Sequence, residues 1–260
     1  MKKIILSLLL LITPLAWAED ASQIMEEAHL ANYYAADDAK AHVSMQIINS
    51  DGATREREFT ILRRDVEDGG DQWFYVFFKK PSDVRGMSFL VNKHPHADDD
   101  RWLFIPAIKM IKRIAASDAR SAFVGSDYTY EDISGRHPSS DSAEMMTEES
   151  IHERNTWKIK NTPKTPEKDY SYRYTWVDQQ TKLILKEVYF DAANTEVRIF
   201  TNDEMKEVNG HWVGIAGTMK NIELNHTTKV RFSKVELNLG IPENIFSERS
   251  LKSAPRKWVR

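Results

Sequence analysis

The chain has 260 residues, a formal net charge of −3 at pH 7 and no cysteine. The missing cysteine excludes disulfides, thiolate chemistry and a lipid anchor on an N-terminal cysteine. Charges of both signs are interspersed along the chain, which argues against a nucleic-acid-binding groove.

The N-terminus has the three parts of a secretory signal peptide. Two lysines precede a short apolar run, Ile4 to Ile12, and the segment Ala16-Trp17-Ala18 supplies small residues around a cleavage point. The run is shorter than the roughly 20 apolar residues that a membrane-spanning helix needs. We therefore expect a cleavable signal peptide over residues 1–18, export to a Gram-negative periplasm, and a single domain over residues 19–260 whose large core replaces disulfides.

The residues after the signal predict an amphipathic helix. Asp20 or Ser22 can cap its start, and Ile24, Ala28 and Ala31 follow at helical spacing. Such a helix needs a surface on which to bury its apolar face.

Eleven later segments predict β-strands joined by turns of hairpin length. They are residues 42–49, 54–64, 73–79, 87–92, 101–105, 156–161, 170–178, 183–191, 195–202, 211–222 and 227–238. Asp51-Gly52 and Asn209-Gly210 are typical hairpin turns. Consecutive strands with short turns predict one antiparallel sheet in sequential order, and a sheet of about eleven strands must curl, close or split.

The middle of the chain departs from the strand pattern. Ile108, Ile111 and Ala115 recur at helical spacing, so we predict a helix over residues 106–117. Residues 118–132 predict a partly helical stretch, and the polar residues 134–150 predict a loop. If the sheet curls, these helices and the N-terminal one cover its concave face over either a packed core or an apolar cavity, which periodicity does not separate.

Three blocks of sequence carry a resemblance to a known family. They are Lys80 to Met87 (KPSDVRGM), Arg101 to Pro106 (RWLFIP), and Arg113-Ile114 with Ser121 to Asp132 (SAFVGSDYTYED). Together they resemble the LolA/LolB-like periplasmic lipoprotein carriers, in the branch of outer-membrane lipoprotein-sorting proteins. The resemblance implies an α+β fold, mainly antiparallel β: a strongly curved, unclosed barrel of about eleven strands with an N-terminal helix and an inserted helical lid on the concave side.

The resemblance also indicates which side chains would contact lipid. Residue parity puts alternate aromatic and aliphatic side chains of strand 73–79 on one face. The candidates for the cavity wall and lid are Phe59, Ile61, Phe74, Val76, Phe78, Met87, Phe89, Trp102, Phe104, Ile108, Met110, Ile111, Ile114 and Phe123. Ordinary core packing is the alternative for each. The basic residues Lys109, Lys112 and Arg113 either contact phosphate headgroups or form a solvated face.

The resemblance to this family also implies a function and binding partners for the chain. We expect a monomeric carrier or chaperone that binds lipid or lipoprotein acyl chains, loads at an inner-membrane transporter and unloads at an outer-membrane acceptor. An accessory protein of a lipid-exporting permease is the alternative. In LolA an arginine locks the lid, and Arg57, Arg63 and Arg64 are all candidates here.

Signals for catalysis and for metal binding are weak. The segment His94-Pro95-His96 with Asp98 to Asp100 has metal-ligand residue types, but it lies between two strands like a solvated loop. The chain contains no Gly-x-Ser-x-Gly or His-Glu-x-x-His motif and no phosphate-binding loop. We predict no enzyme activity, no cofactor and no metal.

Overall fold

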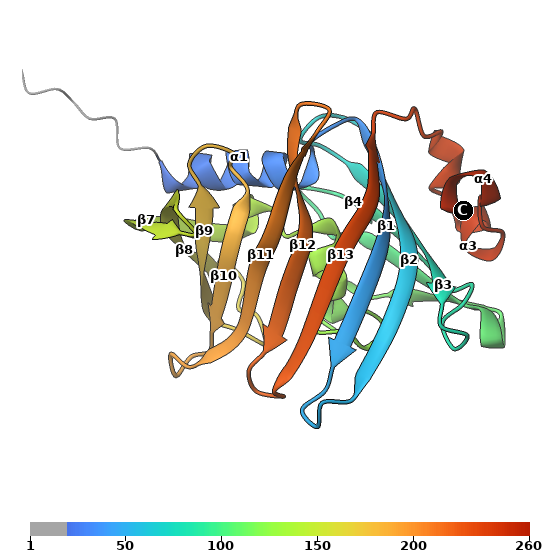
Figure 1. Ribbon diagram of the computed structural model, residues 1–260, viewed down its shortest axis with the longest axis horizontal. Coiled ribbons are helices and arrows are strands. Elements are labelled where there is room, and N and C mark those ends of the chain that lie inside the picture. Colours follow the sequence, from blue (N-terminus) through green and yellow to red (C-terminus); the bar gives the residue numbers. More distant parts are fainter. Residues whose placement is uncertain (1–19) are drawn as a thin grey trace, which may run out of the picture.

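A computed structural model describes residues 20–260, so the predicted signal peptide lies outside the described residues. Thirteen antiparallel strands form one sheet in the order β6-β5-β4-β3-β2-β1-β13-β12-β11-β10-β9-β8-β7. Their bounds are β1 (Asp38–Ile48), β2 (Thr54–Asp65), β3 (Gln72–Lys80), β4 (Ser88–Lys93), β5 (Asp100–Ile105), β6 (Met110–Ile114), β7 (Asp141–Ile151), β8 (Arg154–Pro163), β9 (Tyr172–Asp178), β10 (Ile184–Phe190), β11 (Glu196–Val208), β12 (His211–Asn221) and β13 (His226–Leu237). The sheet curves without closing (Figure 1), which confirms the predicted fold class.

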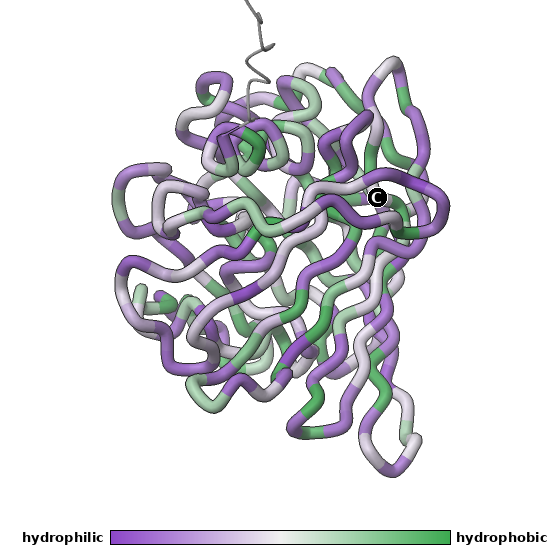
Figure 2. Tube along the Cα trace, turned by 90° about the vertical axis from the view of Figure 1, so that its left-hand side faces the viewer, coloured by the Kyte–Doolittle hydropathy of each residue, from purple (hydrophilic) through white to green (hydrophobic). Residues whose placement is uncertain are grey.

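Alternation of side chains along the strands explains where the core lies. Hydrophobic and hydrophilic residues follow one another along the strands (Figure 2), and on strands such as β1 one face turns inward. On β1 the inward residues include Val43, Met45 and Ile47, all nearly inaccessible to solvent. The first and last strands pair at the centre of the sheet, with Val43 opposite Phe232. This long-range pairing joins the two ends of the meander.

All eleven predicted strands are present, and the two strands not predicted are the edges of the sheet, β6 and β7. The predicted helix over residues 106–117 is wrong. Pro106–Ile108 and Ala116–Asp118 form 3-10 turns, and between them Ile111 on β6 pairs with Phe104 on β5. The loop predicted over residues 134–150 is also wrong, because β7 begins at Asp141. Edge strands lack the two-sided burial that makes internal strands recognisable.

The N-terminal helix α1 (Ala21–Tyr33) is confirmed. Its N-cap is Asp20, whose side chain accepts a hydrogen bond from the backbone of Ser22 at 2.9 Å. The apolar face of α1 packs on Trp157, Ile159 and Val177 from β8 and β9. The helix thus crosses one end of the sheet (Figure 1).

The insertion between β6 and β7 supplies the remaining cover of the concave face. It contains the 3-10 turns 116–118, 123–125 and 138–140 and one short helix, α2 (Tyr130–Ser134). Thr129 and Asp132 form a capping box at the start of α2. The ring of Phe123 lies 5.4 Å from that of Phe89 and 5.8 Å from that of Phe78, centroid to centroid. The insertion is therefore held in the core, while its helical part begins later than predicted.

The C-terminal segment covers the outer face of β2–β5. Its helices are α3 (Glu248–Lys252) and α4 (Arg256–Val259). The hydroxyl of Tyr75 donates to the carbonyl of Ser250, and that of Ser88 to the carbonyl of Leu251, each at 2.7 Å. Both faces of β3 are therefore buried, as its run of aromatic residues predicts.

Candidate functional site

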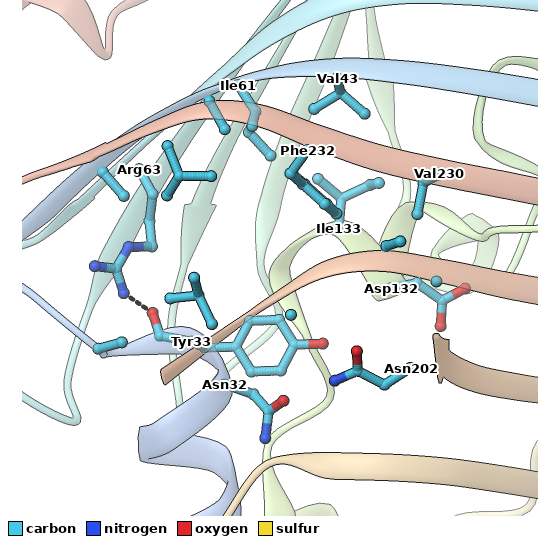
Figure 3. A pocket seen from close by; sticks show the side chains of 18 of the residues that line it. Asn32, Tyr33, Val43, Ile61, Arg63, Asp132, Ile133, Asn202, Val230 and Phe232 are labelled. Atoms are coloured by element: carbon cyan, nitrogen blue, oxygen red, sulfur yellow. Dashed lines mark hydrogen bonds between the residues drawn. The ribbon is translucent and has the colours of Figure 1, made fainter. Parts of the chain in front are cut away.

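The concave face encloses a cavity of about 330 Å³. Its wall comes from β1–β3 and β10–β13, and the end of α1 and the α2 segment lie over it. Apolar side chains gather on one side of the space (Figure 3): Val43, Ile61, Ile133, Val230 and Phe232. The volume is at the lower end of the range of about 300–1,000 Å³ for ligand pockets.

Small residues explain why this part of the concave face is open. Ala39 and Ala41 point inward on β1, and Gly214, Ala216 and Gly217 line the cavity from β12. A Cβ atom on Gly217 would lie 3.1 Å from the ring of Phe200. Larger side chains at these positions would fill the space, as they do in the packed core on β3 and β4.

The structure separates the predicted site residues into four groups. Phe59, Ile61 and Phe74 line the cavity. An adjoining packed core on the same face holds Val76, Phe78, Phe89, Ile114 and Phe123, with Met87 against it. Under the C-terminal segment, on the opposite face, lie Trp102, Phe104 and Ile111. Ile108 and Met110 are exposed, at 60% and 45% of their surface.

The predicted place of Trp102 and Phe104 on the concave wall is thus wrong. Leu103 points inward on β5, so its two neighbours point outward. The sequence contained no sign of this parity, because hydrophobic residues occupy both faces of β5.

Arg63 connects the strand β2 to the end of α1. Its guanidinium donates hydrogen bonds to the carbonyls of Tyr33 and Ala36, at and just after the helix C-terminus. Those carbonyls have no partners within the helix, and a buried cation satisfies them well. The other two candidate arginines contact other parts: Arg57 pairs with Asp83 at 3.3 Å, and Arg64 donates to the carbonyl of Ile241 at 2.7 Å.

Ion pairs fasten the insertion to the strands β7–β11. Each pair has at least one largely buried partner, and several share a carboxylate. The pairs are Arg120 with Glu131 and Asp169, Arg136 with Glu131, Asp141 and Glu167, Arg173 with Asp141 and Glu187, and Arg198 with Asp132. Removing one member would leave an uncompensated buried charge, which is costly.

Lys93 ties three elements together beneath α1. The side chain is 1% exposed, and its ammonium group donates to the carbonyl of Ser134 at 2.7 Å and lies 3.2 Å from Nε2 of His29. Burial lowers the pKa of Lys93 to about 7, although Asp99 and Glu131 act in the opposite direction. Burial, and then the charge of Lys93, lower the pKa of His29 to about 2, so this imidazole is neutral and accepts a hydrogen bond.

We expect stability to rise with pH between pH 7 and 9 because of Lys93. In this window the unfolded lysine, with a pKa of about 10.4, holds a proton that the folded one has lost, so the slope approaches about 1.4 kcal/mol per pH unit. Lys93→Met should flatten this rise. Urea unfolding at pH 7, 8 and 9 measures it, with the exposed Lys206→Met as control. A wild-type slope no steeper than that of Lys93→Met would contradict the expectation.

Comparisons with known proteins place the chain in a family. A family model described as an uncharacterized protein matches residues 70–253. The chain belongs to this family. The match spans the insertion and β7–β13, whereas α1, β1 and β2, and with them Ala41 and Arg63, precede it. No curated protein matches the chain.

The fold of this family member is similar to those of three solved structures. A DUF1329 family protein from Desulfovibrio piger is 23% identical, with a TM-score of 0.81 over 89% of this chain and 99% of that one. A domain from Vibrio parahaemolyticus, described as a putative outer membrane lipoprotein-sorting protein, is 24% identical, with a TM-score of 0.82 over 89% and 98%. A LolA superfamily protein from Nitrosomonas europaea is 17% identical, with a TM-score of 0.68 over 88% and 98%.

Sequence reasoning missed the half of the cavity that comes from the C-terminal strands. Phe200, Val230 and Phe232 line it, as do Tyr33 at the end of α1 and Asp132 in α2. Small residues at alternate positions, as at Ala39 and Ala41, were the available signal. This signal identifies space only when strands distant in sequence are placed beside each other.

The loop between β4 and β5 contains the residue types considered for metal binding. Nδ1 of His94 lies 2.9 Å from Oδ2 of Asp71. Within residues 20–260 no group of three or more His, Cys, Asp or Glu side chains is placed to hold a metal. None of the helices described in this range is long and apolar enough to cross a membrane.

Proposed function

We propose that the protein is a non-enzymatic periplasmic carrier that binds lipid, or the acyl chains of lipoproteins, and moves them towards the outer membrane. The observation that carries this proposal is the cavity: it is largely apolar, it owes its space to small residues, and the end of α1 and the α2 segment cover it. The printed description of the Vibrio parahaemolyticus relative as a lipoprotein-sorting protein supports it.

The size of the cavity agrees with part of one acyl chain. A methylene group takes about the space of a water molecule, ~30 Å³, so about 330 Å³ holds on the order of ten of them. Burying each is worth about 0.8 kcal/mol, so ten contribute about 8 kcal/mol before ordering costs. Binding of this strength keeps the cargo out of water and still permits release.

Two sets of residues would contact such a chain. Phe59, Ile61 and Phe74 border the cavity as it stands and would touch the ligand directly. The packed side chains of the same face would be reached by a longer chain only after the insertion moves: Val76, Phe78, Met87, Phe89, Ile114 and Phe123. Opening at the α1 end, where Arg63 holds the helix, would be the route of release.

The experiment is recovery of the full chain from a periplasmic extract, followed by native mass spectrometry and lipid extraction. We expect mature protein beginning at Glu19, with lipid bound in a ratio near one to one. Protein that is retained in the cytoplasm, or that is empty and takes up no fluorescent acyl probe, would contradict the proposal.

Docking to a lipid-exporting permease is a second candidate, favoured by the hairpin between β5 and β6. Ile108 and Met110 are exposed there beside Lys109 and Lys112. An apolar tip with basic neighbours suits a membrane-bound partner. Photo-crosslinking from position 108 in intact cells tests this candidate: a transporter subunit among the products supports it, and recovery of soluble partners alone counts against it.

A further inference from the structure

The cavity has a polar side as well as an apolar one. Opposite the aliphatic wall lie the side chains of Tyr33, Asn202 and Asp132 (Figure 3). Tyr33 extends from the end of α1, and its hydroxyl points across the space towards Asn202 on β11. Asn202 donates to the carbonyl of Ile184 at 3.3 Å, but a purely hydrocarbon ligand would leave the Tyr33 hydroxyl and one oxygen of Asp132 without partners, which costs free energy.

One carboxylate oxygen of Asp132 accepts hydrogen bonds from the protein, and the other accepts none from the described residues. Oδ2 accepts from the backbone of Thr129 at 2.6 Å, from its hydroxyl at 2.8 Å and from Arg198. No residue of the described chain hydrogen-bonds Oδ1. The side chain keeps 14% of its exposure, and the residue lines the cavity.

The charge state of Asp132 limits what its free oxygen accepts. Burial alone would raise the pKa of this carboxyl, but Arg198, Arg120 and the hydrogen bonds from Thr129 outweigh burial and lower it. Asp132 is therefore ionised at neutral pH, and an ionised carboxylate accepts hydrogen bonds but donates none. A second anion placed beside it would be repelled.

A second orphaned group lies in the same lining. The hydroxyl of Tyr128 is buried without a hydrogen-bond partner in the described chain, and the whole residue is only 9% exposed. Unpartnered buried hydroxyls are rare in folded proteins and call for an explanation. Because this oxygen is itself buried, a ligand in the cavity would reach it only after a neighbouring side chain moves.

We infer that the cavity selects lipids whose hydrocarbon carries an uncharged hydrogen-bond donor, such as a hydroxyl or an amide N–H, and disfavours fatty-acid anions. The inference rests on the proposed function and specifies its ligand class. The ligand's hydrogen-bond donor would lie between the Asp132 carboxylate and the Tyr33 hydroxyl. Its hydrocarbon chain would contact the apolar side of the cavity, at Val43 and Phe232.

The test is displacement of a fluorescent acyl probe from the mature protein at pH 8 by dodecanol, dodecyl methyl ether and dodecanoate. These share a twelve-carbon chain and differ only in the polar group. We expect dodecanol to bind about tenfold more tightly than the ether, the value of one hydrogen bond to a charged acceptor, and dodecanoate to bind most weakly. Dodecanol no tighter than the ether, or dodecanoate as tight as dodecanol, would overturn the inference.

Variants locate the selective group. Tyr33→Phe removes one hydroxyl and should reduce the alcohol-to-ether preference about fivefold. Tyr34→Phe is the control, because its hydroxyl donates to the carbonyl of Gly70 at 2.6 Å and lies outside the cavity lining. An unchanged preference in Tyr33→Phe overturns the proposed site. Failure of the probe itself to bind wild-type protein overturns the carrier function as well, so the two failures are distinguishable.

Discussion

Ala41→Trp should abolish binding of a fluorescent acyl probe, with at least a hundredfold loss of affinity. Ala41 is on the inward face of β1 and borders the cavity. An indole at this position takes the space that the acyl chain would fill, and displacing three methylene groups alone costs about 2.4 kcal/mol. Because the cavity accepts the added ring, we expect a stability loss of no more than about 1–3 kcal/mol. Probe titration and thermal unfolding measure the two effects.

Ser44→Trp is the matched control for this substitution. Ser44 is on the same strand three residues later, and its side chain is exposed on the outer face. The same indole there should leave probe affinity within about twofold of wild type. If Ala41→Trp binds the probe as well as Ser44→Trp does, the cavity is not the acyl site.

Arg63→Met should release the end of α1 while leaving the sheet intact. The guanidinium bonds to the carbonyls of Tyr33 and Ala36 are lost, and hydrogen bonds to a charged group contribute about 1.5–3 kcal/mol. We expect amide exchange in residues 28–36 to accelerate by about 10- to 100-fold, with little change in β1. Probe dissociation should accelerate in parallel, because α1 covers the cavity. Hydrogen exchange by mass spectrometry and stopped-flow release provide the measurements.

Arg57→Met separates this local release from the general cost of losing a buried arginine. Arg57 is also on β2 and 7% exposed, but it pairs with Asp83 and does not contact α1. We expect its loss to destabilise the protein without accelerating exchange in α1. If the amides of α1 are equally protected from exchange in both variants, Arg63 does not hold the end of α1 in place.

The internal strands were predictable because burial of one or both faces gives each of them a distinct residue pattern. Alternation on β1 and β2 follows from one face lying inward, and the aromatic run of β3 follows from burial on both faces by the insertion and the C-terminal segment. Turn signals such as Asp51-Gly52 marked where the chain reverses. Eleven of the thirteen strands and their antiparallel hairpins follow from these local features. The predicted sequential order of the whole sheet is wrong, because β1 pairs with β13 and the strands on either side of the insertion, β6 and β7, lie at opposite edges.

The edge strands β6 and β7 were not predictable, because they lack such a burial pattern. On β6 only Ile114 is fully buried, and the isoleucines of that segment also match a helical spacing. On β7 only Asp141 is buried, and its partners are Arg136 and Arg173 rather than apolar side chains. Local patterns are weak where a strand has a neighbour on one side only, so pairing with β5 and β8 decided these two elements.

The amino-acid sequence by itself determined the hairpins of the meander, the N-terminal helix and the resemblance to the LolA fold, because each depends on local periodicity or on short contiguous blocks. The curvature of the sheet was implied by that resemblance and not by periodicity. Only the tertiary structure decided between a packed core and a cavity. That choice depends on which side chains meet: Ala41 and Gly217 leave space because β1 and β12 both adjoin β13. It likewise selected Arg63 among three arginines, since a helix carbonyl and a strand guanidinium thirty residues apart come into contact only after folding.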